Sequence, residues 1–260
     1  MKSHFLAVTI TILFLITGLS AQDTTLYQKK TFESEDGAMP YRILLPKDFD
    51  EQRMYPLILV LHGSGERGDD NESQLKHGSY LFLKEEVREK YPAIVVFPQC
   101  AANSSWAAIN VIGEGQNREL VFYKKGKPTN DMLLLEGLID YLKEEYSVKK
   151  DQMYVGGLSM GGMGTFELVR RNPKMFVAAF PICGGANPLI ARKVRKIHWW
   201  IFHGADDKVV HPKYSTQMVN ALLNIGSDAT YSLYPNVGHN SWENAFAEQE
   251  LLPWLFSISK

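Results

Sequence analysis

Five short apolar segments, separated by stretches with helical periodicity, constrain the fold of this chain more than any other feature. Each segment is nearly continuous in apolar residues, which is typical of parallel strands that helices cover on both faces. The sequence therefore predicts a mostly parallel central sheet. The five strand-like runs are YPLILVLHG (Tyr55–Gly63), YPAIVVFPQ (Tyr91–Gln99), QMYVGGL (Gln152–Leu158), FVAAFPICGG (Phe176–Gly185) and IHWWIFHG (Ile197–Gly204).

Helices are expected between and after these runs, and the alternation implies β-α-β crossovers. Before them, two strand-like segments flank the turn Glu35-Asp36-Gly37 and predict an antiparallel hairpin at the N-terminal edge of the sheet. The expected architecture is an α/β fold with helices on both faces, in which functional groups gather at the carboxyl ends of the strands. The expected helices are Tyr80–Lys90, Asp131–Tyr146, Met160–Arg171, Lys213–Ile225 and Trp242–Ile258.

The N-terminus has the organisation of a secretory signal peptide. Lys2 precedes the apolar run Phe5–Ile16, and small residues follow up to Ala21. This pattern predicts cleavage after Ala21, so that residues 1–21 are the signal peptide and residues 22–260 form one exported domain, secreted or periplasmic. An uncleaved membrane anchor is the alternative, but the apolar run is short for a bilayer span. We therefore expect no stable membrane anchor after cleavage.

Charge and cysteine content limit the partners. The chain has 28 Lys and Arg against 29 Asp and Glu, a net charge of -1, so it lacks the overall basic character of a protein that binds nucleic acid or an anionic membrane. Cys100 and Cys183 both follow predicted strands. In an oxidising compartment they form a disulfide, or they are two small buried side chains; the sequence leaves both alternatives open, as it does the oligomeric state.

A glycine-rich turn joins the third of these runs to a predicted helix. The segment GLSMG (Gly157–Gly161) matches G-x-S-x-G, a turn that lifts the serine hydroxyl of Ser159 clear of the sheet in a strained backbone conformation. The residues two before and two after the serine must be small, and Gly162 and Gly164 would let helix and strand approach closely. A glycine-rich turn with a capping serine is the alternative, so the decisive question is whether the chain supplies a base.

Candidates for the base and its orienting acid follow later strands. Asp206 and Asp207 come directly after the run IHWWIFHG, and His239 follows the last expected strand, ATYSLYP. The order Ser, Asp, His is that of the α/β-hydrolases. We prefer Asp207, because the aspartate at the D-x-x-V position usually has this role in sequences that resemble HGADDKVV, and expect Asp206 to cap or bind backbone in the turn. The weaker histidine candidates are His62 and His203, expected to be structural at strand ends, and His211, expected to begin the helix after Asp207.

The segment LHGSGERGDD after the first long apolar run is the candidate oxyanion loop. Its small residues leave backbone N–H groups uncovered, and we expect Ser64 to donate to an oxyanion together with the N–H of Met160. Gly63 and Gly65 are the alternatives to Ser64.

Two tryptophans are candidates for substrate binding. Trp106 lies in the long aperiodic segment Gln99–Lys127, and Trp242 is three residues past His239. Such rings stack on a sugar or a phenolic group, or they pack the loop against the domain.

Taken together, these residues resemble the α/β-hydrolase superfamily, and within it secreted bacterial esterases near the polyhydroxybutyrate depolymerases, the feruloyl and acetyl-xylan esterases and the prolyl-oligopeptidase-like hydrolases. The likeness covers the chain after the leader, and His211 stands where such sequences often have proline. The segments that carry it are LHGSGERG, VVFPQC, GLSMGGMGTFEL, FPICGG, FHGADDKVV and VGHNSWENAF.

The resemblance implies a serine hydrolase with Ser159 as nucleophile, Asp207 as orienting acid and His239 as general base. It implies no metal or organic cofactor, and the chain shows no HExxH or clustered His/Cys ligand spacing. The expected substrate is a small or polysaccharide-linked acetyl or feruloyl ester. A prolyl-oligopeptidase-like serine peptidase is the alternative activity, although the chain is short for the propeller domain of such enzymes. A non-catalytic binding protein on this scaffold would lack a member of the triad.

Overall fold

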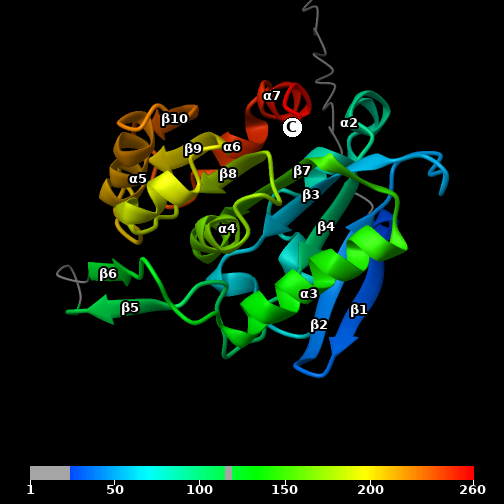
Figure 1. Cartoon of the computed structure of the whole chain (residues 1–260), viewed down its shortest axis with the longest axis horizontal. Helices are drawn as coiled ribbons and strands as arrows, with labels where there is room; N and C mark the ends of the chain where they lie inside the picture. The colour runs from blue at the N-terminus through cyan, green and yellow to red at the C-terminus, as the bar shows by residue number, and fades with distance from the viewer. Residues whose placement is uncertain (1–23, 115–118) are drawn as a thin grey trace, which may run out of the picture.

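An eight-stranded sheet forms the centre of the protein (Figure 1). The computed structural model describes residues 24–114 and 119–260, so the expected signal peptide lies outside the described residues. The strands follow the spatial order β1-β2-β4-β3-β7-β8-β9-β10. Their bounds are β1 Gln28–Ser34, β2 Gly37–Leu44, β3 Tyr55–Leu61, β4 Ile94–Pro98, β7 Val148–Leu158, β8 Ala178–Ile182, β9 His198–Gly204 and β10 Ala229–Tyr234.

The N-terminal hairpin lies at one edge of this sheet, as the sequence predicts. Strand β2 is antiparallel to both of its neighbours, β1 and β4, whereas every other neighbouring pair in the sheet is parallel. Ser34 pairs with Gly37, which leaves Glu35 and Asp36 as the hairpin loop. Gly37 has a φ of 131°, a backbone conformation that residues with a Cβ rarely adopt.

Helices cover both faces of the sheet. In β3 every residue is buried, with Leu57, Leu59 and Leu61 in one hydrophobic core and Ile58 and Val60 in the other. This is why the strand is apolar throughout instead of alternating. The first core contains side chains of α3 (Asn130–Glu145), α4 (Met160–Arg171) and α5 (Lys213–Leu223), and the second contains those of α1 (Ser79–Leu83), α2 (Glu85–Lys90), α6 (Trp242–Ala247) and α7 (Leu251–Phe256) (Figure 1).

Two of the expected helices are each divided into two. The expected helix Tyr80–Lys90 breaks at Lys84, whose backbone is extended, into α1 and α2. The expected helix Trp242–Ile258 breaks into α6 and α7 because Pro253 cannot donate a backbone hydrogen bond and its ring would clash with the carbonyl four residues earlier. Pro253 instead lies in the first turn of α7, where a backbone N–H has no helical partner.

A second, two-stranded antiparallel sheet lies in the segment for which the sequence predicts no regular structure. It consists of β5 (Ile109–Ile112) and β6 (Glu119–Phe122) and stands apart from the main sheet in Figure 1. The Leu120 N–H donates to the Tyr214 hydroxyl at 2.8 Å, and the Asn187 side chain donates to the Phe122 carbonyl at 2.9 Å. The strands are short and mostly exposed, so they lack a periodic pattern.

The described cysteines are not linked to each other. Cys100 and Cys183 are both free and buried, and they belong to the cores on opposite faces of the sheet. The disulfide alternative is therefore wrong, and the reading of both residues as small buried side chains holds. Among residues 24–114 and 119–260, no helix combines the length and the apolar character that a membrane crossing requires.

Candidate active site

Ser159 lies at the junction of β7 and α4 in a backbone conformation with φ 54° and ψ -114°. Its N–H donates to the Ile182 carbonyl of β8 at 2.9 Å, which fixes the turn against the neighbouring strand. A Cβ at Gly161 would lie 1.9 Å from the Leu61 carbonyl oxygen, and one at Gly157 would lie 2.6 Å from the same atom. The expectation that both flanking positions must be small is therefore confirmed, since either side chain would strike the backbone of β3.

The side chains of Ser159, His239 and Asp207 form a continuous line of hydrogen bonds. Ser159 Oγ lies 2.9 Å from His239 Nε2, and His239 Nδ1 lies 2.7 Å from Asp207 Oδ2. The three residues follow β7, β10 and β9, respectively, so they meet above the carboxyl ends of the strands, where the parallel topology places them. The Nδ1–H of His239 donates to the carboxylate, which leaves the lone pair of Nε2 facing the serine hydroxyl.

Asp207 is the buried carboxylate of this line. Its Oδ1 accepts hydrogen bonds from the backbone N–H groups of Val209 at 2.8 Å and Val210 at 2.9 Å. Burial would raise the pKa of Asp207, but the hydrogen bonds from His203, His239 and the Val210 N–H outweigh it and hold that pKa well below its usual range. Asp207 is therefore ionised and oriented at neutral pH. Asp206 is exposed, and its N–H donates to the Val237 carbonyl.

The remaining candidate histidines serve different purposes. His62 accepts from the Cys100 N–H at 2.9 Å and donates to the Gly63 carbonyl, so it links the ends of β3 and β4. His211 is exposed and accepts from the Lys213 N–H at the start of α5. His203 is wholly buried, and its Nε2 lies 3.2 Å from Asp207 Oδ2. The sequence predicts only a structural role for His203, because nothing in its local pattern indicates the contact with Asp207.

The candidate oxyanion loop lies beside Ser159. A Cβ at Gly63 would be 2.9 Å from the side chain of the adjacent Leu158. Ser64 begins the short 3-10 turn η2 (Ser64–Glu66), whose first hydrogen bond joins the Glu66 N–H to the Gly63 carbonyl. The N–H groups of Ser64 and Gly65 therefore have no hydrogen-bond partner within the turn. In the same way, the N–H of Met160, the first residue of α4, has no partner within that helix. Ser64 with Met160, or Gly63 or Gly65 in place of Ser64, remains our proposal for the oxyanion hole.

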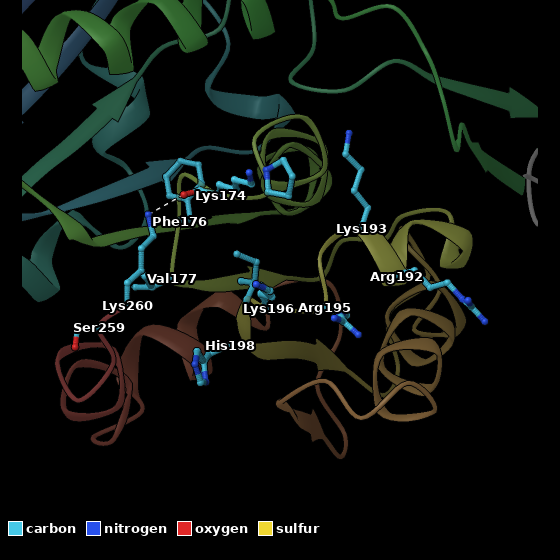
Figure 2. A pocket seen from close by; sticks show the side chains of 12 residues that line it. Lys174, Phe176, Val177, Arg192, Lys193, Arg195, Lys196, His198, Ser259 and Lys260 are labelled. Atoms are coloured by element: carbon cyan, nitrogen blue, oxygen red, sulfur yellow. Dashed lines mark hydrogen bonds between the residues drawn. The ribbon is translucent and has the colours of Figure 1, made fainter.

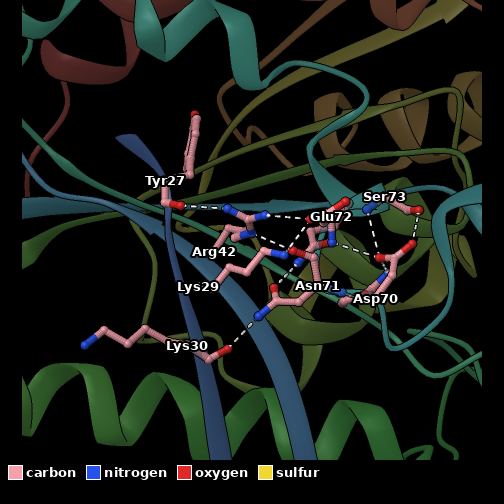
Figure 3. A network of polar contacts seen from close by, with 10 residues as sticks. Tyr27, Lys29, Lys30, Arg42, Asp70, Asn71, Glu72 and Ser73 are labelled. Atoms are coloured by element: carbon pink, nitrogen blue, oxygen red, sulfur yellow. Dashed lines mark hydrogen bonds and ion pairs between the residues drawn. The ribbon is translucent and has the colours of Figure 1, made fainter. Parts of the chain in front are cut away.

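A polar network fastens this loop to the N-terminal hairpin (Figure 3). The buried Arg42 of β2 donates to the Asn71 carbonyl at 2.5 Å, and its guanidinium lies 3.9 Å from the Glu72 carboxylate. Gln99, just after β4, donates to Asp70 Oδ1 at 2.8 Å and to the Glu66 carbonyl at 3.2 Å. Two strands thus hold the segment that follows the candidate oxyanion donors, and so keep those donors in place.

The two candidate tryptophans have different surroundings. Trp106 has no exposed surface, and its Nε1 donates to the His62 carbonyl at 3.1 Å. The prediction that Trp106 binds substrate is therefore wrong, because its ring packs the loop against the domain. Trp242 is partly exposed, with its ring centroid 5.4 Å from that of His239 in an edge-to-face arrangement. Trp242 remains a candidate for substrate binding.

One group of potential metal ligands coincides with this site. The ligand atoms of Cys183, Asp207 and His239 all lie within 4.8 Å of one another. Asp207 and His239 are already hydrogen bonded to each other, and burial raises the pKa of the Cys183 thiol, whereas a metal ligand would have to be the thiolate. The arrangement fits proton transfer along hydrogen bonds better than metal coordination.

The chain matches a known protein family over most of its length. Residues 33–241 match the family model named Esterase and described as "Putative esterase". The chain belongs to this esterase family. The matched range contains Ser159, Asp207 and His239.

Individual relatives carry esterase names and are in part much longer. A bifunctional acetylxylan esterase/xylanase of Neocallimastix patriciarum is 27% identical over 158 residues, which are 60% of this chain and 20% of that protein. A probable feruloyl esterase C of Aspergillus niger is 23% identical over 204 residues, or 78% of this chain and 68% of that protein. The solved structure of a thermostable esterase is 33% identical with a TM-score of 0.81, covering 91% of this chain and 64% of the other.

Proposed function

We propose that this member of the esterase family is a secreted serine carboxylic ester hydrolase that acts through an acyl-enzyme. The observation that carries the proposal is the line from Ser159 Oγ through His239 to the buried Asp207, with separations of 2.9 Å and 2.7 Å. A hydroxyl, an imidazole and a carboxylate at hydrogen-bond distance are the parts that a serine nucleophile needs for activation.

In the proposed reaction, His239 Nε2 takes the proton of Ser159 as the hydroxyl oxygen attacks the ester carbonyl. Asp207 holds the imidazole in the tautomer that can accept this proton and stabilises the charge that develops on it. The backbone N–H groups of Met160 and Ser64 stabilise the oxyanion of the tetrahedral intermediate. The protonated His239 then donates to the leaving alcohol, and a water molecule releases the acid in a second round of the same steps.

For the substrate, we propose small or carbohydrate-linked esters with an acetyl or feruloyl group. The names of the acetylxylan and feruloyl esterase relatives support this choice. The partly exposed Trp242 beside His239 supports it too, since an aromatic face next to the reacting groups would suit a phenolic acyl group or a sugar ring. For the export of the protein, we propose removal of residues 1–21; mass spectrometry of the secreted protein would give the new N-terminus.

Hydrolysis assays with the wild type and the Ser159→Ala variant test the activity. The substrates are 4-nitrophenyl acetate, methyl ferulate, acetylated xylan and a prolyl amide. We expect wild-type activity on the esters and its loss in Ser159→Ala. A covalent fluorophosphonate probe should label the wild type and not the variant, which tests the nucleophile independently of the substrate.

Each result has a distinct meaning. Ester hydrolysis that survives in Ser159→Ala removes Ser159 from the role of nucleophile. Faster cleavage of the prolyl amide than of any ester favours a peptidase. No labelling and no turnover, in a folded wild-type protein, favour a non-catalytic binding protein.

A further inference from the structure

A basic pocket lies at the amino ends of the strands (Figure 2), whereas the candidate active site lies at their carboxyl ends. The pocket has a volume of about 630 Å³ and is formed by residues that precede β8 and β9, by His198 at the start of β9, and by residues 259–260. Ser159 and Asp207 follow the carboxyl ends of β7 and β9, whereas the pocket lies at the amino ends of β8 and β9. A strand as long as β9 spans on the order of 20 Å, so the two sites are separate.

The rim of the pocket is rich in positive charge. Arg192, Lys193, Arg195 and Lys196 lie within five consecutive residues, and Lys174 belongs to the other connection that lines the pocket. All five side chains are on exposed residues, and none forms an ion pair with a residue that the structure describes. Figure 2 shows Arg192 and Lys193 extending outward from the rim.

Unpaired cations also occur elsewhere on the described surface, so the feature particular to this rim is that five of them surround one pocket. The exposed lysines Lys29, Lys47 and Lys213 each pair with a glutamate within the described chain. The residues lining the pocket include no carboxylate side chain; His198 at its margin contacts Asp228 at 2.6 Å. Since the whole chain has a net charge of -1, the positive charge at this rim is a local concentration.

The floor of the pocket is apolar and consists of buried side chains. It is formed by Phe176, Val177 and Ile197, which have exposed fractions of 2%, 4% and 2%. Lys260 closes one side, and its ammonium group donates to the Lys174 carbonyl at 2.7 Å (Figure 2). The result is a concave surface with several unpaired cations around it, which can hold a chain that carries repeated anions.

We propose that this pocket binds a carboxylate-bearing polysaccharide. The anionic character of the ligand follows from the pocket alone, and the choice of a polysaccharide rests on the proposed function. A flat anionic bilayer fits a concave pocket poorly, because the apolar floor residues lie too deep to enter it. A polymer bound at the amino ends of the strands leaves the carboxyl ends free. One segment of the polymer can therefore be held while an ester elsewhere on the same polymer reaches Ser159. Two contacts to one polymer raise the effective concentration of its ester groups.

Affinity electrophoresis in gels containing polygalacturonate tests the pocket separately from catalysis. The Ser159→Ala variant is used as the parent, so that hydrolysis plays no part. We expect polygalacturonate to retard this parent, neutral arabinoxylan to have little effect, and added NaCl to weaken the retardation because salt screens exposed charges. Combining Arg195→Glu and Lys196→Glu in the parent should weaken binding about tenfold, since two attractive contacts become repulsive.

A matched control carries the same change of net charge at another surface. Lys124→Glu with Lys125→Glu alters two exposed residues after β6 and should leave the retardation as in the parent. Circular dichroism checks that both double variants are folded. Equal weakening by the two double variants overturns the proposal, because it would reflect net charge alone.

Two further outcomes also overturn the proposal. One is equal retardation by arabinoxylan; the other is binding to phosphatidylglycerol vesicles or to DNA but not to polygalacturonate, which would assign the pocket to another class of partner. Ester hydrolysis by the wild type is measured separately. Binding of polygalacturonate without ester hydrolysis would contradict the proposed function but support the proposed pocket. Ester hydrolysis without binding of polygalacturonate would contradict the pocket but support the proposed function.

Discussion

The Nε2 atom of His203 lies 3.2 Å from Oδ2 of Asp207, the same carboxylate oxygen that His239 contacts at 2.7 Å. His203 is wholly buried, and its Nε2 also lies 2.8 Å from the Val210 carbonyl, so this nitrogen faces two acceptors and carries a proton. Its Nδ1 lies 2.7 Å from the hydroxyl of Ser215 in α5. Asp207 is thus held between two imidazoles, one of which is anchored to a helix.

We predict that His203→Leu lowers kcat with little change in KM, because Asp207 would lose a donor that orients it without any loss of substrate contacts. The expected loss is roughly tenfold, at the lower end of the range for a hydrogen bond to a charged group, since His239 and two backbone N–H groups still hold the carboxylate. His203→Gln, whose amide can still donate, should retain more activity than His203→Leu. Steady-state kinetics with 4-nitrophenyl acetate measure both variants, and equal losses would contradict a positioning role.

The strain in the backbone of Ser159 can be measured by comparing two variants that both lack the serine hydroxyl. Ser159→Gly should be more stable than Ser159→Ala, because glycine tolerates a φ of 54° with a ψ of -114°. Relief of about 1–3 kcal/mol of strain exceeds the ~0.5–1 kcal/mol that glycine loses through its more flexible unfolded chain. Both variants lack the hydroxyl, so the difference in their free energy of unfolding in urea isolates the backbone term. A less stable glycine variant would indicate that the turn is unstrained.

The glycines near the site provide a matched pair. Gly161→Ala places a Cβ 1.9 Å from the Leu61 carbonyl, whereas a Cβ at Gly65 meets no atom within 4 Å. We expect Gly161→Ala to lower the free energy of unfolding by about 3 kcal/mol or more, since backbone on both sides must shift. Gly65→Ala should change it by less than about 0.5 kcal/mol. Urea unfolding of both variants checks the difference, and similar values would refute the crowding of β3 against α4.

Features that depend on local pattern could be predicted from the sequence. The continuous apolar runs predicted the parallel strands because each residue of a central strand is buried, and the G-x-S-x-G segment predicted the turn because only glycine fits beside Leu61. The order of Ser159, Asp207 and His239 then predicted which side chains would meet, since parallel strands bring their carboxyl ends to one edge.

Features that depend on contacts between distant segments could not be predicted from the sequence. The β5–β6 hairpin is held by Tyr214 and Asn187, which come long after it in the chain. Trp106 is buried because Gly164 leaves room for it: a Cβ at Gly164 would lie 2.4 Å from the Trp106 side chain, too close for any other residue at that position. The contact between His203 and Asp207 depends on how the loop after β9 folds back toward the strand. None of these relationships has a signature in the local sequence.

The two tryptophans should respond differently to substitution. Trp106→Ala should lower the free energy of unfolding by roughly 3–5 kcal/mol, because it empties part of the core and removes the hydrogen bond to the His62 carbonyl. Trp242→Ala should cost less stability but change the ratio of kcat/KM for methyl ferulate to that for 4-nitrophenyl acetate, since the ring lies beside His239. Urea unfolding and the two assays test this contrast; an unchanged ratio in Trp242→Ala would remove that residue from substrate binding.

The lowered pKa of Asp207 makes its contribution to stability depend on pH. A carboxyl whose folded pKa is below its unfolded value of about 3.9 stabilises the protein above that pH and loses this contribution as the pH falls toward the folded pKa. Asp207→Asn keeps the shape of the side chain but cannot ionise. We therefore expect the wild type to be more stable than Asp207→Asn near neutral pH and the gap to narrow below about pH 4, where Asp207 of the unfolded chain begins to take up a proton while Asp207 of the folded protein is still ionised. Urea midpoints across this range measure the gap. A gap that stays constant down to the acid transition would show that the Asp207 charge adds nothing to stability, while Asp206→Asn, at the exposed neighbouring position, should follow the wild type throughout.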